Sequence, residues 1–247
     1  MATADKLATV AENVPKVYNA GYYIGILKAN SIIEKTITEY SDDKTNSVKK
    51  YVFYSCPKLT TINLPAVKRV EDYAFYDCPK LTTVNLPVAT SVGSYVFQNC
   101  SVLTTINLPV VTTIGTSTFT NCSALTTVNF PAAKTISGSL FTNCSALTTV
   151  DFPVAKNVVA YAFNNCESLT TIILRSGTVC NLSNKNAFNG CTLINGTGGY
   201  IYVPSSLVET YKTATNWVTY ASKFRALEDY TVDGTTTGAL DESKVSA

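Results

Sequence analysis

The sequence Cys56-Pro-Lys-Leu-Thr-Thr-Ile-Asn-Leu-Pro65 begins a pattern that returns every 22 residues along most of the chain. A fixed period of roughly 20 to 29 residues, with leucine-type residues in register, is typical of a solenoid whose units bury their apolar side against their neighbours. The chain is therefore predicted to be one continuous stack of repeats. The residues that mark the period are Cys56, Cys78, Cys100, Cys122, Cys144 and Cys166.

Three columns of apolar residues are expected to form the core. Between Ile62 and Leu64 the chain alternates apolar, polar, apolar and then reaches Pro65, which predicts a short strand with one buried face. Proline has no N–H to donate to a neighbouring strand, so the ladder of parallel strands should end there. The columns are Leu59, Leu81, Leu103, Leu125, Leu147 and Leu169; Ile62, Val84, Ile106, Val128, Val150 and Ile172; and Leu64, Leu86, Leu108, Phe130, Phe152 and Leu174.

The return leg of each unit carries a second apolar pattern, a branched residue followed five positions later by phenylalanine. A phenylalanine at one position of every rung predicts a buried spine, since a smaller residue there would leave a void costing about 3–5 kcal/mol. The branched residues are Val70, Val92, Ile114, Ile136 and Val158, and the phenylalanines are Phe75, Phe97, Phe119, Phe141 and Phe163.

Together these motifs resemble the leucine-rich repeats of the Treponema pallidum or BspA type, over roughly residues 31–228. The resemblance implies a leucine-rich repeat solenoid, with a curved parallel β-sheet on one face and short turns or 3₁₀ segments on the other. It also implies a surface adhesin or recognition protein.

Both ends of the solenoid are expected to be capped. Residues 31–55 are a degenerate, more charged first rung in which Ile37 is aligned with Ile62. The 22-residue repeats cover 56–165, a longer rung covers 166–190, and a small helical C-terminal cap covers 191–228. Within the cap we expect a strand at 200–204, Ser205 or Ser206 as an N-cap and a short helix over 207–213. Trp217, Tyr220 and Phe224 should cover the open apolar end, and residues 229–247 are predicted to be a flexible tail.

Residues 1–30 are expected to be a helical anchor segment. They lack the basic and apolar regions of a standard secretory signal, so an export signal was removed or the protein leaves the cell by another route. Residues 7–21 resemble an N-terminal segment of phage or prophage structural proteins of gut Firmicutes. This segment either oligomerises or docks to a virion, or folds back on the first rung. The predicted anchor residues are Leu7, Val10, Val14, Val17 and Tyr18.

Composition limits the function classes. The formal net charge is +2, and the chain has no basic stripe, so nucleic acid is not an expected partner. No run of residues is long enough to insert into a membrane. The chain has no histidine, which excludes Ser-His-Asp and Cys-His catalysis and any histidine-containing zinc site. We expect no enzymatic activity, no cofactor and no metal.

The regular cysteines are predicted to be small buried residues rather than disulfides, because free cysteine packs as a hydrophobe. Cys180, within the longer rung, either pairs with Cys191 or remains free.

Two surfaces are candidate binding sites. The first, called here the strand face, projects outward from the predicted strands, although threonine also suits strands without any ligand. The second, called here the aromatic face, carries tyrosines on the return leg, which either recognise a partner or pack between rungs. The strand face consists of Thr61, Asn63, Thr83, Asn85, Thr105, Asn107, Thr127, Asn129, Thr149 and Asp151. The aromatic face consists of Tyr51, Tyr54, Tyr73, Tyr76, Tyr95 and Tyr161.

The sequence thus predicts a non-enzymatic recognition protein. The leading hypothesis is a fibre-type attachment or decoration component on a phage virion surface. It would bind a host-surface protein or glycan, and contact other virion proteins or its own copies through residues 1–30. The alternative is a BspA-like adhesin, either secreted or on a bacterial cell surface. A structural protein that binds only its own copies is a third possibility.

Overall fold

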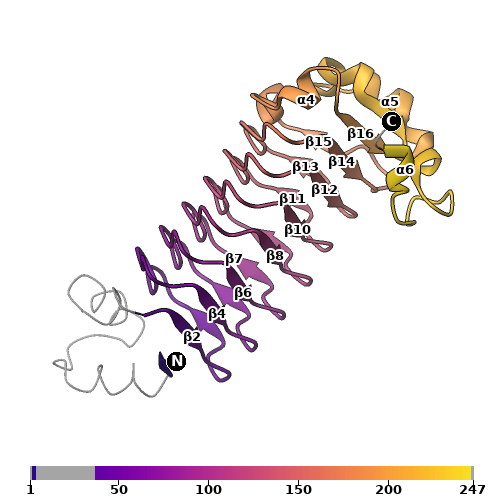
Figure 1. Cartoon of the computed structure of the whole chain (residues 1–247). Coiled ribbons are helices and arrows are strands. Elements are labelled where there is room, and N and C mark those ends of the chain that lie inside the picture. Colours follow the sequence, from indigo (N-terminus) through magenta and orange to yellow (C-terminus); the bar gives the residue numbers. More distant parts are fainter. Residues whose placement is uncertain (1, 4–36, 246–247) are drawn as a thin grey trace.

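The computed structural model describes residues 2–3 and 37–245, which build a stack of rungs ending in a cap of short helices (Figure 1). The predicted anchor residues Leu7, Val10, Val14, Val17 and Tyr18 lie outside the described residues. The predicted leucine-rich repeat solenoid with a parallel sheet on one face is confirmed, and its return legs carry short paired strands as well as turns.

One short strand per rung forms the first row of the solenoid. All pairs in this row are parallel, within the sheets β1-β2-β4-β6, β8-β10 and β12-β14-β16-β17. In the central rungs the strands begin one residue before the predicted Ile62–Leu64 triplet, so each is a Thr-apolar-Asn triplet with the proline two residues beyond its end. The strands are β1 (Ala2–Thr3), β2 (Glu39–Ser41), β4 (Thr61–Asn63), β6 (Thr83–Asn85), β8 (Thr105–Asn107), β10 (Thr127–Asn129), β12 (Thr149–Phe152), β14 (Thr171–Leu174), β16 (Tyr200–Val203) and β17 (Phe224–Ala226).

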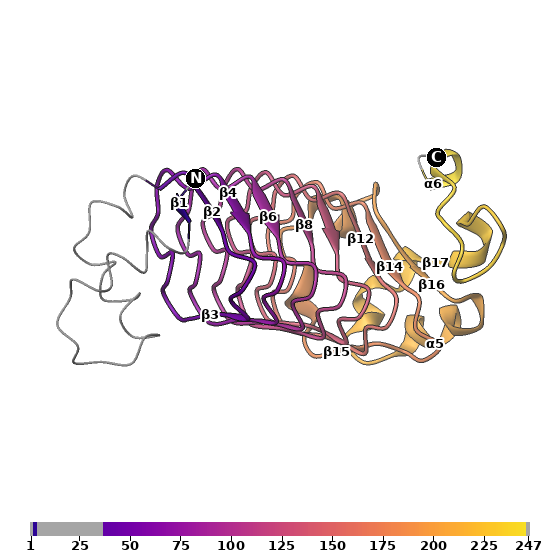
Figure 2. The same ribbon diagram turned by 90° about the horizontal axis from the view of Figure 1, so that it is seen from below.

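The return legs form a second row, which runs along a different side of the stack (Figure 2). These strands pair in parallel as β3-β5-β7-β9 and β11-β13-β15. Their second residue is buried in every rung, which is the predicted column from Val70 to Val158. The strands are β3 (Ser47–Val48), β5 (Arg69–Val70), β7 (Ser91–Val92), β9 (Thr113–Ile114), β11 (Thr135–Ile136), β13 (Asn157–Val158) and β15 (Asn181–Leu182).

The first rung exists, but its register differs from the prediction. Strand β2 pairs with β4 so that Tyr40 lies opposite Ile62. Ile37 therefore occupies the position that Leu59 has in the next rung, and aligning it with Ile62 was wrong. The sequence comparison missed this because Tyr40, an aromatic residue, replaces the aliphatic residue of that column and packs on Phe53.

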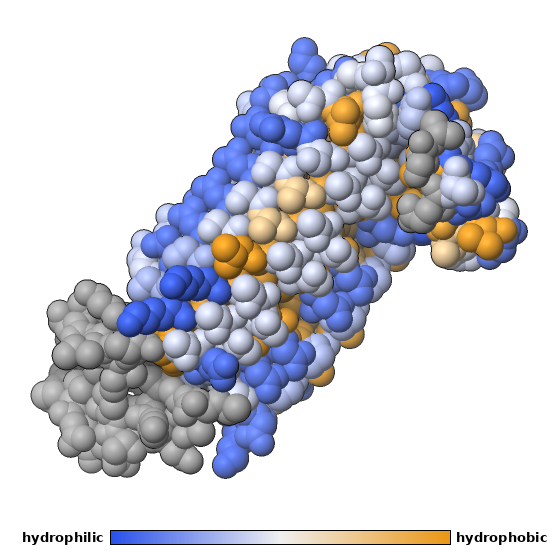
Figure 3. All heavy atoms as spheres, viewed as in Figure 1, coloured by the Kyte–Doolittle hydropathy of each residue, from blue (hydrophilic) through white to orange (hydrophobic). Residues whose placement is uncertain are grey.

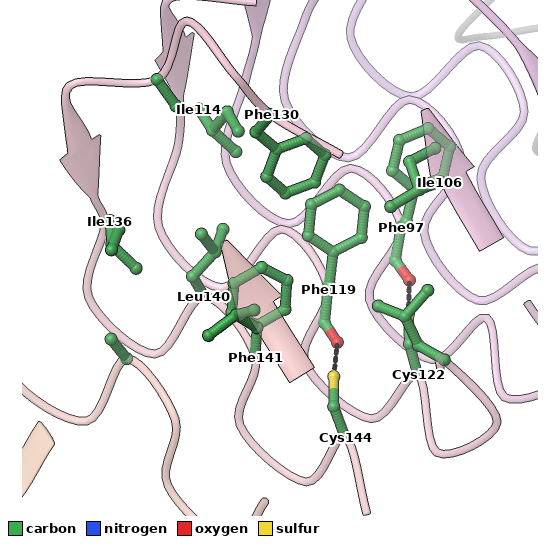
Figure 4. Packing of buried hydrophobic residues seen from close by; sticks show 14 of the residues in the cluster. Phe97, Ile106, Ile114, Phe119, Cys122, Phe130, Ile136, Leu140, Phe141 and Cys144 are labelled. Atoms are coloured by element: carbon green, nitrogen blue, oxygen red, sulfur yellow. Dashed lines mark hydrogen bonds between the residues drawn. The ribbon is translucent and has the colours of Figure 1, made fainter. Parts of the chain in front are cut away.

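The phenylalanine spine is confirmed as the centre of the core. The rings stack from rung to rung with centroids 5.1–5.7 Å apart, and the interior ones are fully buried (Figure 4). Offset stacking at this spacing adds about 0.5–1.5 kcal/mol per pair beyond the area buried. The stack contains Phe53, Phe75, Phe97, Phe119, Phe141, Phe163 and Phe188.

Each rung up to Asn165 holds two residues in the left-handed region of backbone conformation, and the longer rung holds one, Gly190. One lies directly before the cysteine of the rung and the other four positions earlier, at the start of the turn. Asparagine suits the first position because it tolerates this conformation better than most residues do. The first column is Ser55, Asp77, Asn99, Asn121, Asn143, Asn165 and Gly190, and the second is Tyr51, Tyr73, Tyr95, Ser117, Ser139 and Tyr161.

All eight cysteines are buried thiols outside any disulfide, so Cys180 and Cys191 are not bridged. Cys180 lies just before β15, within the longer rung. There its backbone N–H donates to the hydroxyl of Tyr211 at 2.7 Å, and its carbonyl accepts from the indole of Trp217. The cysteine is therefore part of the contact between the longer rung and the cap.

The C-terminal cap contains α4 (Thr192–Asn195), η2 (Ser205–Leu207), α5 (Val208–Thr213) and η3 (Trp217–Lys223). Trp217 and Tyr220 contact the ring of Phe188, the last in the spine, so the predicted cover of the open end is confirmed. The prediction of Ser205 or Ser206 as the N-cap was wrong, because both residues lie within η2 and Leu207 is the N-cap of α5. The N–H and hydroxyl of Ser205 instead bond to the carboxylate of Glu228.

Residues 229–247 were predicted to be a flexible tail, but the described part has defined contacts. After η4 (Leu227–Tyr230), the chain folds back in an antiparallel bridge between Thr231 and Leu240 and ends in α6 (Glu242–Val245). The guanidinium of Arg175 donates to the carbonyls of Thr236 and Gly238, at 2.6 and 2.9 Å. We call residues 231–245 the strap. The strap is held by Arg175, which lies more than 60 positions earlier in the chain. The composition of residues 229–247 alone could not predict this contact.

Candidate binding surfaces

The strand face is exposed over its central rungs. The hydroxyl-bearing side chains of Thr83, Thr105, Thr127 and Thr149 are exposed, and Thr61 is half-buried. In the space-filling view, side chains of intermediate hydropathy follow one another along the rungs of the face shown, with few strongly hydrophobic ones among them (Figure 3).

The asparagines of the strand face bond to one another. The side-chain amide of Asn85 donates to Asn63 at 2.6 Å, and that of Asn129 donates to Asn107 at 2.8 Å. Asn63 in turn donates to the hydroxyl of Ser41. Such amide ladders tie neighbouring rungs together, so part of the hydrogen-bonding capacity of the strand face serves the fold.

The strand face ends at Asp151. The Arg175 guanidinium bonds to both carboxylate oxygens of Asp151, at 2.8–3.0 Å. The next two positions of the same column, Ile173 and Tyr202, are apolar and buried, because Leu240 and other residues of the strap pack over them. The exposed grid therefore extends from β4 to β12 only.

The aromatic face is a stack of exposed or half-buried tyrosines beside the N-terminal rungs. Tyr51, Tyr73 and Tyr95 lie ring over ring, with centroids 5.1 and 4.7 Å apart. Tyr54 stacks on Tyr76 at 4.9 Å, and the two columns touch edge to face. The structure thus brings five of the six predicted aromatic residues into one cluster. The sixth, Tyr161, is 44% exposed and contacts no other ring in the described chain.

The backbone of these tyrosines is unusual. Tyr51, Tyr73, Tyr95 and Tyr161 have φ between 56° and 63°, a left-handed conformation that costs a bulky residue roughly 1–2 kcal/mol. The turn does not require tyrosine, since Ser117 and Ser139 adopt the same conformation in the same column. Stacking offsets the cost for the clustered rings, but Tyr161 has no stacking partner within the part of the chain that the structure describes.

Charged groups border the aromatic face near its N-terminal end. The ammonium of Lys50 lies 5.0 Å from the ring centroid of Tyr51 and 5.5 Å from that of Tyr73, within cation–π range. Lys49 pairs with Glu71 at 3.0 Å. The lysine contact lowers the pKa of Glu71 below its ordinary value against the opposing effect of desolvation, so this carboxylate is ionised at neutral pH.

Two phenols of the aromatic face, those of Tyr54 and Tyr73, are neutral hydrogen-bonding groups. Partial burial, and then the neighbouring Tyr76 and Asp77, raise the pKa of Tyr54. Partial burial and the adjacent tyrosines likewise raise the pKa of Tyr73. Both rings therefore keep their protons at neutral pH and can donate as well as accept hydrogen bonds.

The described residues contain no group of three or more acidic, cysteine or histidine side chains that could hold a metal ion. Within the same part of the chain, no helix has the length and hydropathy needed to cross a membrane. The arrangement offers surfaces for recognition and no convergent set of titratable groups.

The left-handed conformation of the tyrosines could not be predicted from the sequence, because nothing local distinguishes Tyr51 from an ordinary turn residue. The first left-handed column, directly before the cysteine of each rung, carried a usable signal. Asp, Asn or Gly precedes the cysteine in nearly every rung, and these residue types in register indicate a positive φ.

Comparison with known protein families decides the classification. Residues 46–158 and 112–214 match the family described as BspA type Leucine rich repeat region, with six copies of the repeat. The chain belongs to this BspA-type family. The resemblance to phage structural proteins is not supported by any match. A comparison with curated proteins gives no match.

One solved structure with a TM-score above 0.5 shares the fold of this chain. The leucine rich repeat protein of T. pallidum is 23% identical, with a TM-score of 0.54 over 72% of this chain and 78% of that chain. A leucine rich cell surface protein of Faecalibacterium prausnitzii A2-165 is 18% identical, with a TM-score of 0.46 over 75% of this chain. The match spans 63% of the F. prausnitzii chain, less than two thirds. The pneumococcal vaccine antigen PcpA is 14% identical, with a TM-score of 0.37 over 77% of this chain and 66% of that chain.

Proposed function

We propose that this BspA-type chain is a non-enzymatic adhesin, on a bacterial cell surface or secreted, that binds its partner through the aromatic face. The observation that carries the proposal is the tyrosine column at positive φ, where the fold accepts serine equally well. When a residue keeps a strained backbone conformation that the fold does not require of it, the strain is a reason to look for a function. Tyrosine supplies contact area and a polar tip at low entropic cost, as recognition surfaces require.

The strand face is the second candidate and has weaker support. Its asparagines are partly satisfied by one another, and its threonines are residues that strands favour. We therefore assign the strand face to the fold first and to binding second. The family match supports the surface adhesin, whereas virion attachment rested on residues 7–21, which lie outside the described chain.

The proposal is tested by binding of the full chain to a panel of purified host extracellular proteins and immobilised oligosaccharides. The test variant replaces Tyr51, Tyr73 and Tyr95 by serine, the residue that the same column already holds at positions 117 and 139. The matched control replaces Thr83, Thr105 and Thr127 of the strand face by serine. We expect the tyrosine variant to lose binding and the threonine variant to keep it. Equal binding by wild type and the tyrosine variant would reject the assignment.

Location is tested separately with antibodies against the chain on intact producing cells. Labelling of the cell surface, or recovery from the medium, supports the adhesin. Recovery with purified virions contradicts it.

A further inference from the structure

We infer that the tyrosine column contains a subsite for a neutral sugar ring at Ser117 and Ser139, between Tyr95 and Tyr161. We call these two serine positions the serine gap. The inference rests on the proposed function, because it names the ligand class that the aromatic face would take.

The serine gap is defined by one column of equivalent backbone positions. Tyr95, Ser117, Ser139 and Tyr161 follow one another in consecutive rungs, and all four have φ between 53° and 61°. Tyr73 and Tyr95 show where a ring projects from this position, because they stack with centroids 4.7 Å apart. Rungs are spaced by about 4.8 Å, so Tyr95 and Tyr161 begin about 14 Å apart with two ring-sized positions between them.

The two ends of the serine gap present aromatic faces. One side of the Tyr95 ring is covered by Tyr73, and the residue on its other side is Ser117, whose side chain ends at a hydroxyl. Tyr161 touches no other ring in the described chain and is 44% exposed. A flat apolar ring face entering at Ser117 would therefore continue the existing stack.

The floor of the gap carries unused hydrogen-bonding groups. Within the described chain, the hydroxyls of Ser117 and Ser139 make no hydrogen bond, although their backbone N–H groups bond to the next rung. The hydroxyl of Thr120 donates to the Ser139 carbonyl, and the hydroxyl of Thr142 donates to the Tyr161 carbonyl. The oxygen atoms of these two threonine hydroxyls can still accept hydrogen bonds. Groups that both donate and accept match sugar hydroxyls, which do the same.

Charge argues for a neutral ligand. Between Cys78 and Asn165 the only charged residues are Lys80, Lys134, Asp151 and Lys156, and none belongs to the column of the gap or to the columns next to it. A phosphorylated, sulfated or strongly acidic ligand would find no counter-ion here. A protein anchor is also a poorer match, because protein hot spots require a deep desolvated pocket, whereas this gap is lined by hydroxyls.

The subsite is tested by filling it. Ser117→Tyr and Ser139→Tyr place rings where the backbone already holds tyrosine in other rungs, so the fold should tolerate them. Val110→Tyr adds a ring at an exposed position outside both candidate faces and is the matched control. Each full-length variant is measured, with the wild type, on an array of immobilised neutral and sialylated oligosaccharides.

We expect the wild type to bind neutral oligosaccharides and Ser117→Tyr to weaken this binding on the order of tenfold or more, with unchanged Tm. Val110→Tyr should bind as wild type. Tyr161→Ser, which removes one wall, should also weaken binding.

Absence of binding to every oligosaccharide on the array would overturn the inference, as would binding that Ser117→Tyr leaves intact. Binding of a purified protein that is lost in Ser117→Tyr would assign the gap to a protein ligand and also overturn it. The proposed function fails differently, when the variant lacking Tyr51, Tyr73 and Tyr95 binds every partner as wild type does.

Discussion

The thiol of Cys122 donates a hydrogen bond to the carbonyl oxygen of Phe97, with Sγ and O 3.1 Å apart (Figure 4). The same bond joins successive rungs along the core, from Cys78 with Phe53 to Cys191 with Phe163. The cysteine column therefore both fills space and satisfies the buried carbonyl of the phenylalanine in the preceding rung.

Replacing Cys122 by alanine should lower the free energy of unfolding by about 1–3 kcal/mol. The change removes the sulfur from a fully packed site and leaves the Phe97 carbonyl with one bond fewer. Urea denaturation followed by circular dichroism measures the effect. Ser123→Ala, on the adjacent exposed residue, is the control and should change stability by less than about 0.5 kcal/mol. A loss as small for Cys122→Ala would show that the thiol bond is dispensable.

Buried thiols should make the protein unstable in alkali. Burial raises the pKa of Cys100 to about 12, whereas an unfolded cysteine has a pKa of about 8.5. The unfolded state therefore releases protons first, so this stability is complete below about pH 8.5 and declines as pH rises towards 12. At about pH 10 a buried thiol with this pKa should lower the free energy of unfolding by on the order of 2 kcal/mol. Urea titrations across this range should show a shallower decline for Cys100→Ala. Parallel pH profiles for the two proteins would argue against the assignment.

The solenoid and its core could be predicted from the sequence because the repeat is local and in register. Leu59, Ile62 and Phe75 recur at fixed spacing, so their burial follows from periodicity alone. The strap could not be predicted, because Arg175 anchors it through two carbonyls of residues far away in the chain. The tyrosines of the aromatic face could be predicted from their shared position in the repeat. The separation of Tyr161 from the stacked rings at Ser117 could not, because it depends on which rings stack.

Truncating the centre of the phenylalanine spine should cost more than changing its shape. Phe119 lies between Phe97 and Phe141 at 5.6 and 5.7 Å, and it is fully buried. We expect Phe119→Ala to destabilise by about 3–5 kcal/mol and Phe119→Leu by clearly less. Thermal unfolding compares the two. Similar losses for both would indicate that ring stacking, rather than filled volume, dominates.

Arg175 should control the order of the strap. Its guanidinium is largely buried and bonds to Asp151 as well as to two strap carbonyls. Arg175→Ala should increase hydrogen exchange at amides of residues 232–244 and leave rungs β4 to β10 protected. Lys212→Ala, which breaks the exposed pair with Glu209, is the control and should change nothing measurable. Unchanged exchange in the strap of Arg175→Ala would show that apolar contacts alone hold it.

The central claim, that tyrosines at positive φ are kept for binding rather than for folding, is tested most directly at Tyr161. This residue has φ of 59° and no ring partner among residues 37–245, so Tyr161→Asn should relieve strain. Stability and oligosaccharide binding are measured on the same protein. The account predicts an unchanged or slightly raised free energy of unfolding, by about 0.5 kcal/mol, together with weakened binding. A loss of about 1 kcal/mol or more with unchanged binding would contradict it.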